Sequence, residues 1–314
     1  MSAVGAPKHR PPQNFYLITL GIMKFSIQKP LFLSGATGTE IQRRGFPTTL
    51  PLWSAQVLFD RPDLLTEIYL DYIRAGADII TTNTFRTQRR TLALAGLADE
   101  TERINRLAVD LAVAARDAEK RSRPVYIAGC ITTLEDCYRP DLVPAPGVCA
   151  AEHDEQVSLL AETPVDFFLL ETFNTITEAE IAAKKVAKTG RPFAVSFTAG
   201  LDGNILNGDT WENAVVRLAP LSPLVIMVNC VAPDVATHAL GLLAPVAKAH
   251  NIPFGAYANG TGVAGGEEGW LFSQTGSPVQ EYAGECKKWQ KMGATVIGGC
   301  CGTSPEYTKL YSQL

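Results

Sequence analysis

Eight apolar runs of strand length recur along the chain, and they constrain its fold more than any other feature. Each run is rich in β-branched or aromatic residues, and a longer stretch with helical periodicity follows most of them. We expect strands at Leu31 to Gly35, Asp78 to Thr84, Val125 to Thr132, Val165 to Thr172, Pro192 to Ala199, Leu224 to Val231, Pro253 to Gly260 and Thr295 to Gly302. Alternating strands and helices predict a parallel sheet, and eight repeats favour its closure into a barrel.

The helical pattern is clearest in four of the intervening stretches. These are Pro62 to Ala75, Thr101 to Lys120, Ile176 to Lys188 and Val279 to Met292. The strands are almost continuously apolar, which is typical of strands buried on both faces. The chain has 314 residues, a length that single barrels of this kind reach. We therefore predict an α/β fold, a single-domain (β/α)8 TIM barrel formed by residues 26–314.

The first 25 residues do not fit this pattern. The apolar stretch from Phe15 to Met23 resembles the core of a signal peptide, but it lacks a small-residue cleavage site, and Lys24 follows it directly. The stretch is also too short to cross a bilayer as a helix. We expect residues 1–25 to be an extension outside the fold, with Met23 as the biological start.

Composition limits the partners and the compartment. The formal net charge is −4, and no run of Lys and Arg could follow a phosphate backbone, so a nucleic-acid interface is not expected. The chain has seven cysteines, an odd number without a secretory signal, which favours a reducing compartment over a disulfide framework. We expect a cytoplasmic protein that acts on small molecules and not on membranes, and the composition does not indicate an oligomeric state.

Three cysteines stand at the ends of expected strands. Cys230 ends the sixth strand, and Cys300 and Cys301 end the eighth. Adjacent cysteines rarely crosslink to each other, and the separation of 300 − 230 = 70 residues equals two strand-helix units, so the three thiols belong to next-but-one strands. Isolated free cysteines are often ordinary small core residues. Three thiolates on converging strand ends instead make most of a tetrahedral zinc site and leave one position for a substrate.

These segments resemble a known family. Asn229-Cys230 and Gly298-Gly299-Cys300-Cys301-Gly302 are similar to the zinc-binding signatures of the homocysteine S-methyltransferase family, and the resemblance extends from Leu31 to about Leu310. Further matching motifs are Gly35 to Glu40, Leu52 to Ala55, Thr82 to Phe85 and Leu170 to Thr172. The region of Trp53 and the absence of folate or cobalamin domains most resemble the short, stand-alone enzymes that use S-methylmethionine.

The resemblance implies a chemistry for the three cysteines. It predicts that Cys230, Cys300 and Cys301 hold Zn2+ and that a methyl group moves from a sulfonium donor, S-methylmethionine or S-adenosylmethionine, to the thiolate of homocysteine, forming methionine. The sequence does not identify the donor, and betaine is also open. A free thiol with a pKa near 8.5 is a poor nucleophile at neutral pH, and a metal ion removes its proton. Two alternatives remain open: a different thiol or selenol acceptor, and a zinc or redox barrel without methyl transfer.

The resemblance also assigns residues to the acceptor's amino-acid group. Glu171, at the end of an apolar strand, corresponds to the residue that holds the amino group of homocysteine, although a solvated loop carboxylate is the alternative. Gly35 and Ala36 form the turn whose backbone N–H groups receive the carboxylate in the family, although such a turn can need small residues for purely steric reasons.

Three further substrate-binding candidates follow from the same resemblance. Ser34 stands where the family usually has an aspartate that assists Glu171. The loss of a charge-assisted hydrogen bond would weaken acceptor binding by about 1 to 3 kcal/mol. Asn83 belongs to the Thr82 to Phe85 motif. Asn259, before a glycine at the end of the seventh strand, is either a turn residue or an occupant of the open zinc position before the substrate arrives.

Several loop features carry weaker predictions. The glycine-rich segment Thr261 to Gly276 is long enough to be a lid. The sequence Gly260 to Gly265 spells GxGxxG, but no apolar helix follows, so a dinucleotide site is not expected. The loop Asp136 to Pro140 is expected above the barrel, where it would shape donor specificity. Cys130 is expected to line the pocket.

The remaining cysteines and the histidines receive no role. Cys137, Cys149 and Cys286 have no neighbours typical of metal ligands. The four histidines lie in the N-terminal tail or in helix and loop segments, and none ends a strand.

Overall fold

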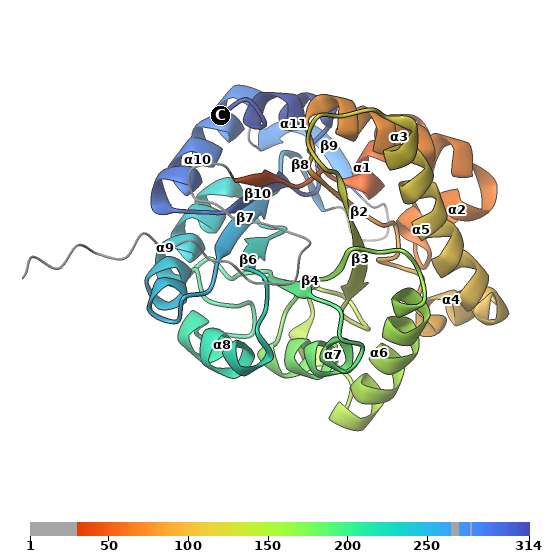
Figure 1. Cartoon of the computed structure of the whole chain (residues 1–314), viewed down its shortest axis with the longest axis horizontal. Coiled ribbons are helices and arrows are strands. Elements are labelled where there is room, and N and C mark those ends of the chain that lie inside the picture. Colours follow the sequence, from red (N-terminus) through yellow and green to blue (C-terminus); the bar gives the residue numbers. More distant parts are fainter. Residues whose placement is uncertain (1–29, 265–269, 277) are drawn as a thin grey trace, which may run out of the picture.

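The strands form a parallel ring. The computed structural model describes residues 30–264, 270–276 and 278–314, so the expectations for residues 1–25, including the start at Met23, fall outside the described residues. The ring strands are β1 (Leu31–Phe32), β2 (Ile79–Thr81), β3 (Tyr126–Thr132), β4 (Phe167–Phe173), β5 (Phe193–Phe197), β6 (Ile226–Asn229), β7 (Phe254–Ala258) and β10 (Val296–Gly299). Their order is β1-β10-β7-β6-β5-β4-β3-β2, and a bridge from Leu33 to Ile79 joins the two ends. The predicted (β/α)8 barrel is confirmed (Figure 1).

Helices surround this ring (Figure 1). They are α1 (Thr37–Arg43), α2 (Gln56–Asp60), α3 (Pro62–Ala75), α4 (Arg89–Leu94), α5 (Thr101–Ala118), α6 (Pro146–Ala161), α7 (Ile176–Lys188), α8 (Trp211–Leu218), α9 (Pro233–Ala249), α10 (Val279–Met292) and α11 (Pro305–Tyr311). The four predicted helices correspond to α3, α5, α7 and α10, and only α5 ends earlier than expected. None of the described helices has the length and apolar character to cross a membrane.

Two hydrophobic clusters stabilise the barrel. The larger one fills the space between the strands and the helices and contains residues such as Phe168, Trp211 and Trp289. The smaller one includes Leu169 and Met227 and contains side chains from alternate positions of the same strands. Because side chains alternate across a strand, burial on both faces explains the continuous apolar runs.

Six of the eight barrel strands end earlier than predicted, whereas β3 ends at Thr132 as predicted and β4 ends one residue later, at Phe173. Cys230 lies one residue beyond β6 and has a positive φ of 57°, which turns the chain out of the ladder. Cys300 lies one residue beyond β10. A left-handed conformation is unfavourable for a residue with a side chain, so these ends are specific departures from the strand that place side chains at the mouth of the barrel.

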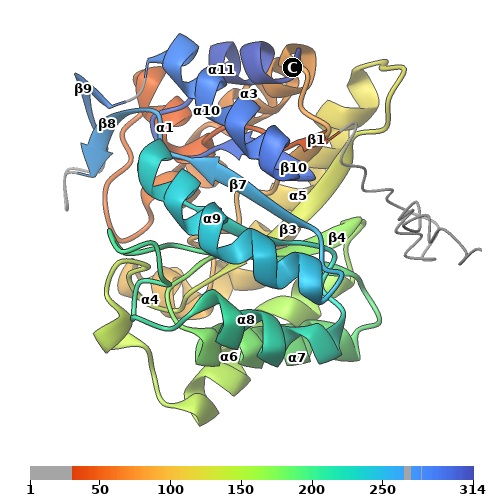
Figure 2. The same ribbon diagram turned by 90° about the vertical axis from the view of Figure 1, so that its left-hand side faces the viewer.

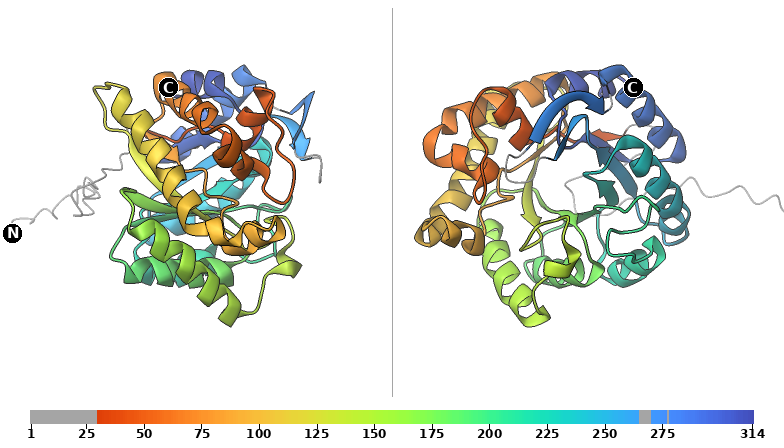
Figure 3. Two further views of the ribbon diagram at one scale, coloured as in Figure 1. Left: turned by 90° about the vertical axis from the view of Figure 1, so that its right-hand side faces the viewer. Right: turned by 180° about the vertical axis from the view of Figure 1, so that it is seen from behind.

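The segment predicted as a lid loop is a β-hairpin. Strands β8 (Thr261–Ala264) and β9 (Trp270–Gly276) pair in antiparallel fashion, and the residues between them, 265–269, are not described. The side chain of Gln42 in α1 donates to the Trp270 carbonyl at 2.7 Å. Figure 2 shows the hairpin projecting from one end of the barrel, and the rear view in Figure 3 shows it over one side of the ring. The residues that directly follow Gly260 belong to β8.

Gly298 in β10 is required for close contact with the first strand. A Cβ atom at this position would lie 2.6 Å from the Leu33 Cβ. We predict that Gly298→Ala lowers the free energy of unfolding by about 2 kcal/mol, because the overpacked strands must separate. Urea denaturation measures the change.

Gly284 in α10 offers a matched control, since a Cβ atom there would meet nothing within 4 Å. Gly284→Ala should raise the free energy of unfolding by about 0.5 to 1 kcal/mol, because alanine has the higher helix propensity. Equal effects of the two substitutions would contradict the steric explanation.

Candidate metal centre and substrate pocket

Strand register brings the three cysteines to one level of the barrel. Strand β7 pairs with β6 on one side and with β10 on the other. Its Tyr257 is the register partner of both Asn229 and Gly298. Cys230 follows Asn229 directly, and Cys300 follows Gly298 by two residues, so both cysteines leave their strands just beyond the same height.

Backbone hydrogen bonds from residues 257–260 hold both cysteine segments. The Cys230 amide donates to the Tyr257 carbonyl at 3.2 Å, and the Cys300 amide donates to the Ala258 carbonyl at 2.7 Å. The Cys301 carbonyl accepts from the Gly260 amide at 2.8 Å. The end of β7 is therefore a backbone template for the whole cysteine cluster.

The three sulfur atoms lie within 4.8 Å of one another. The Cys230 Sγ is 3.9 Å from the Cys301 Sγ, and none of the seven cysteines forms a disulfide. Tetrahedral zinc with Zn–S bonds of about 2.3 Å requires sulfur separations of about 3.8 Å. The donor set and its spacing therefore fit a zinc ion with three thiolate ligands.

Hydrogen bonding within the cluster favours one thiolate. The thiols of Cys300 and Cys301 hold the pKa of Cys230 well below its usual value, while their own pKa values rise well above it. The hydroxyl of Tyr138 donates to the Cys230 carbonyl at 3.0 Å and lies 3.1 Å from the Cys230 Sγ. Several hydrogen-bond donors around one sulfur stabilise its thiolate form.

The cysteines open into a cavity of about 410 Å³. Residues that follow β1, β2 and β3 form much of its wall, together with Trp270 of the hairpin. Trp53, Thr172 and Cys230 line this cavity and have positive φ angles of 46°, 59° and 57°. Such backbone conformations are unfavourable outside glycine and tend to cluster at functional sites.

Glu171 lies at this cavity, with Cys130 and Tyr257 as side-chain hydrogen-bond donors. The Cys130 thiol donates to its Oε2 at 3.2 Å, and burial raises the pKa of Glu171 to about 7. Cys130 is fully buried beneath the carboxylate. It therefore supports Glu171, whereas it was expected to line the pocket itself. A desolvated carboxylate of this kind gains a large free energy when a cation pairs with it.

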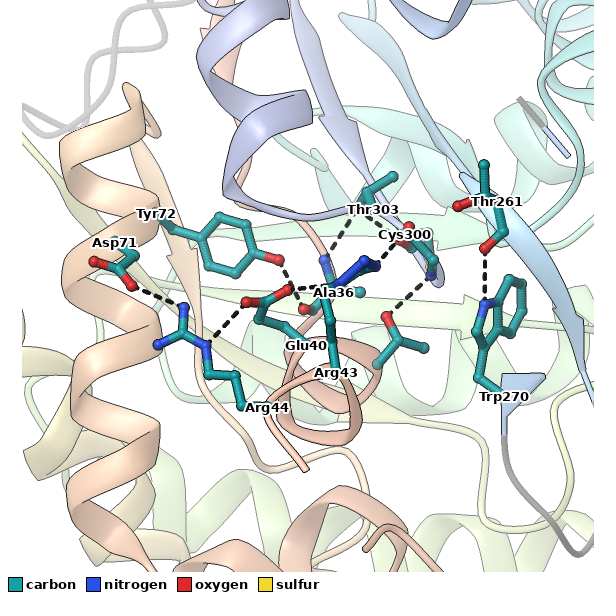
Figure 4. Close-up of polar contacts among 12 residues, drawn as sticks. Ala36, Glu40, Arg43, Arg44, Asp71, Tyr72, Thr261, Trp270, Cys300 and Thr303 are labelled. Atoms are coloured by element: carbon teal, nitrogen blue, oxygen red, sulfur yellow. Dashed lines mark hydrogen bonds and ion pairs between the residues drawn. The ribbon is translucent and has the colours of Figure 1, made fainter. Parts of the chain in front are cut away.

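The turn after β1 connects the cavity to the cysteine pair. Ser34, Gly35 and Ala36 all line the cavity. The Ala36 amide donates to the Thr303 Oγ1 at 3.2 Å, and that hydroxyl donates to the Cys300 carbonyl at 2.7 Å (Figure 4). A carboxylate bound at this turn would therefore compete with Thr303 for the Ala36 amide.

The two asparagine candidates differ in their placement. Asn83 lines the cavity, and its side chain donates to the Ser54 carbonyl at 2.8 Å, which holds the wall formed by Trp53 and Ser54. Asn259 is absent from the described cavity lining, although its buried Oδ1 has no hydrogen-bond partner among the described residues. Its exchange at a metal position stays a prediction.

Sequence reasoning missed several cavity residues. Cys137 received no role but lines the cavity, and Tyr138 beside it reaches the Cys230 sulfur. Both belong to the Asp136 to Pro140 loop, which was expected above the barrel. Arg86 also lines the cavity. The signal for Arg86 was its position directly after the Thr82 to Phe85 motif.

Comparisons with known proteins agree with this geometry. The family model described as homocysteine S-methyltransferase matches residues 31–313. The homocysteine S-methyltransferase of Escherichia coli (strain K12) is 30% identical over 295 residues, which cover 88% of this chain and 93% of that protein. The selenocysteine methyltransferase of Astragalus bisulcatus is 28% identical over 304 residues, which cover 87% of this chain and 89% of that protein.

A solved structure has the same fold. The metallated form of the homocysteine methyltransferase MmuM from Escherichia coli superposes with a TM-score of 0.78 at 27% sequence identity. The match covers 91% of this chain and 97% of that one. The family model spans nearly the whole described barrel, including the cysteine cluster and the cavity. The chain belongs to the homocysteine S-methyltransferase family.

Proposed function

We propose that this protein transfers a methyl group from a small sulfonium donor to the thiolate of homocysteine, with zinc as its metal. The observation that carries the proposal is the cluster of three sulfurs within 4.8 Å at a cavity that also contains Glu171. The sulfur cluster suits a metal ion that binds a substrate thiol, and the Glu171 carboxylate suits the ammonium of an amino acid. Homocysteine carries both a thiol and an ammonium group.

The proposed ligands are Cys230, Cys300 and Cys301. An all-sulfur donor set favours zinc among the abundant divalent metals. With zinc bound, the site supplies positive charge that lowers the pKa of the acceptor thiol, so no general base is needed. All seven cysteines are free, which fits the reducing cytoplasm in which we place the enzyme.

The protein residues position the substrates and exclude water. Glu171 pairs with the acceptor's ammonium, while Leu50, Trp53 and Trp270 provide apolar walls. The acceptor sulfur forms the new S–CH3 bond, and the broken S–CH3 bond leaves its electron pair on the donor sulfur, which becomes a neutral thioether. Opposite charges cancel in this step, so a cavity poor in water favours it.

The cavity volume supports a small donor. Donor and acceptor must occupy the same space of about 410 Å³ during transfer. S-methylmethionine is similar in size to the acceptor, whereas S-adenosylmethionine adds an adenosyl group. We therefore propose S-methylmethionine as the donor in preference to S-adenosylmethionine.

The metal assignment predicts a specific loss. Cys300→Ala should lower zinc content from one ion per chain to near zero and reduce methyl transfer from S-methylmethionine to homocysteine at least 1000-fold, because two thiolates hold zinc poorly. Elemental analysis and a methionine-formation assay measure the two effects. Cys149→Ala is the matched control, since Cys149 is equally free but lies in α6. Full zinc content in Cys300→Ala would refute the ligand set.

The raised pKa of Glu171 predicts a pH dependence. Only the carboxylate form pairs with an ammonium, so kcat/KM for homocysteine should fall as the pH drops below about 7. Glu171→Gln should reduce kcat/KM for homocysteine about 10- to 100-fold at pH 8. It should also abolish the fall of kcat/KM below about pH 7. The variant should be more stable than the wild type at pH 8, because burial penalises the charged form that it lacks. An unchanged acidic limb in Glu171→Gln would exclude Glu171 as its origin.

Ser34 favours a second candidate, in which the acceptor is another thiol or a selenol. Within the described cavity lining, Glu171 and Asp136 are the acidic residues, and the buried Ser34 supplies no second charge beside Glu171. The match to a selenocysteine methyltransferase gives this acceptor class a precedent.

A comparison of homocysteine with selenocysteine in the wild type and in Ser34→Asp separates the candidates. If homocysteine is the acceptor, the wild type should have the higher kcat/KM for homocysteine, and Ser34→Asp should lower the KM for homocysteine about 10-fold. A wild-type kcat/KM at least tenfold higher for selenocysteine would favour the second candidate.

A further inference from the structure

Arg86 is unusual among the arginines that the structure describes. The others form ion pairs or hydrogen bonds with nearby oxygens, as Arg90 does with Glu152 and Arg139 with Asp141. For Arg86 no such partner occurs within the described residues, and its Nε is buried without a hydrogen bond. A buried N–H group without a hydrogen bond is costly, which points to a partner that arrives from outside the chain.

The Arg86 side chain lines the cavity that contains the cysteine cluster. Its guanidinium carbon lies 5.8 Å from the centre of the Phe85 ring, and the Trp53 ring meets Phe85 edge-on at 6.0 Å. These aromatic contacts leave the donor N–H groups of Arg86 uncommitted. Cys137 lines the same cavity, and burial raises the pKa of its thiol, which the charge of Arg86 opposes.

The other charged groups of the cavity do not neutralise Arg86. Asp136 and Glu171 are the acidic residues in its described lining, and neither forms an ion pair with Arg86 within the described part of the chain. The Asp136 Oδ1 already accepts from the Tyr138 amide at 2.8 Å. The guanidinium therefore remains available to a ligand.

The position of Arg86 distinguishes the two substrates. Glu171 lies within β4, whereas Arg86 lies five residues beyond the end of β2 at Thr81. The acceptor sulfur must reach the cysteines, with its ammonium at Glu171. The methyl donor must approach that sulfur from the mouth of the barrel, where the loops after the strands supply the contacts.

We propose that Arg86 is the binding residue for the carboxylate of the methyl donor, an inference that rests on the proposed function. A planar guanidinium with parallel N–H groups matches a carboxylate in two-point contact. The donor class is thus a sulfonium that carries a carboxylate, such as S-methylmethionine. This residue selects against sulfonium compounds that lack an anionic group.

Isothermal titration calorimetry of the zinc-loaded protein without acceptor tests the proposal. The two probes are S-methylmethionine and its carboxamide, which differ only in the carboxylate. The wild type should bind S-methylmethionine about 10- to 100-fold more tightly than the amide, as expected for a charge-assisted contact. Arg86→Gln should remove this preference, and Arg86→Lys should retain part of it.

Arg139→Gln is the matched control. Arg139 lies in the loop after β3, next to the cavity residue Tyr138, but it is exposed and paired with Asp141. It should keep the full preference for the carboxylate. Retention of that preference in Arg86→Gln, or no preference in the wild type, would overturn the proposal.

The calorimetric result is independent of the proposed function. If the preference depends on Arg86 but no methyl reaches homocysteine, the proposed reaction is wrong and the carboxylate site stands. If methyl transfer occurs and Arg86→Gln keeps the preference, the reaction stands and the Arg86 site is wrong.

Discussion

The pairing of β7 with both β6 and β10 is the constraint on which the site depends. It places Asn229 and Gly298 opposite the same residue, Tyr257. A shift of either neighbouring strand by one residue would reverse its side chains between the barrel interior and the helices, and the sulfurs could not converge. The small residues of β10 serve this pairing, because Gly298 lies against Leu33 without room for a side chain.

The charges in the cavity suit a reaction that destroys charge. Burial raises the pKa of Glu171, and Arg86, in the loop after β2, has a buried Nε without a hydrogen-bond partner among the residues that the structure describes. Apolar and small residues occupy much of the wall between them. In the proposed reaction, each of these charged side chains pairs with an opposite charge on a substrate before the methyl group moves. The substrates would then be held at their amino-acid ends.

The sequence was sufficient to predict the barrel, all eight of its strands and the convergence of three cysteines, because these depend on strand-length periodicity and on which end of a strand carries a residue. It was insufficient for Tyr138 and Cys137, whose approach to Cys230 depends on the path of a loop. The hairpin of β8 and β9 was missed because the glycines of that segment weaken a strand pattern. The hydrogen bond from the Ala36 amide to the Thr303 hydroxyl joins residues 267 positions apart, and no local pattern predicts such a contact.

The backbone template at residues 257–260 has a consequence for how such an enzyme can diverge. Amides and carbonyls hold the cysteine segments, and these groups are present whatever side chains the neighbouring loops carry. Ser34, Arg86 and Tyr138 come from other segments, which follow β1, β2 and β3 respectively. Substitutions there can change which molecules are accepted while the arrangement of sulfurs is inherited intact, so substrate range can evolve in this barrel without reinvention of its chemistry.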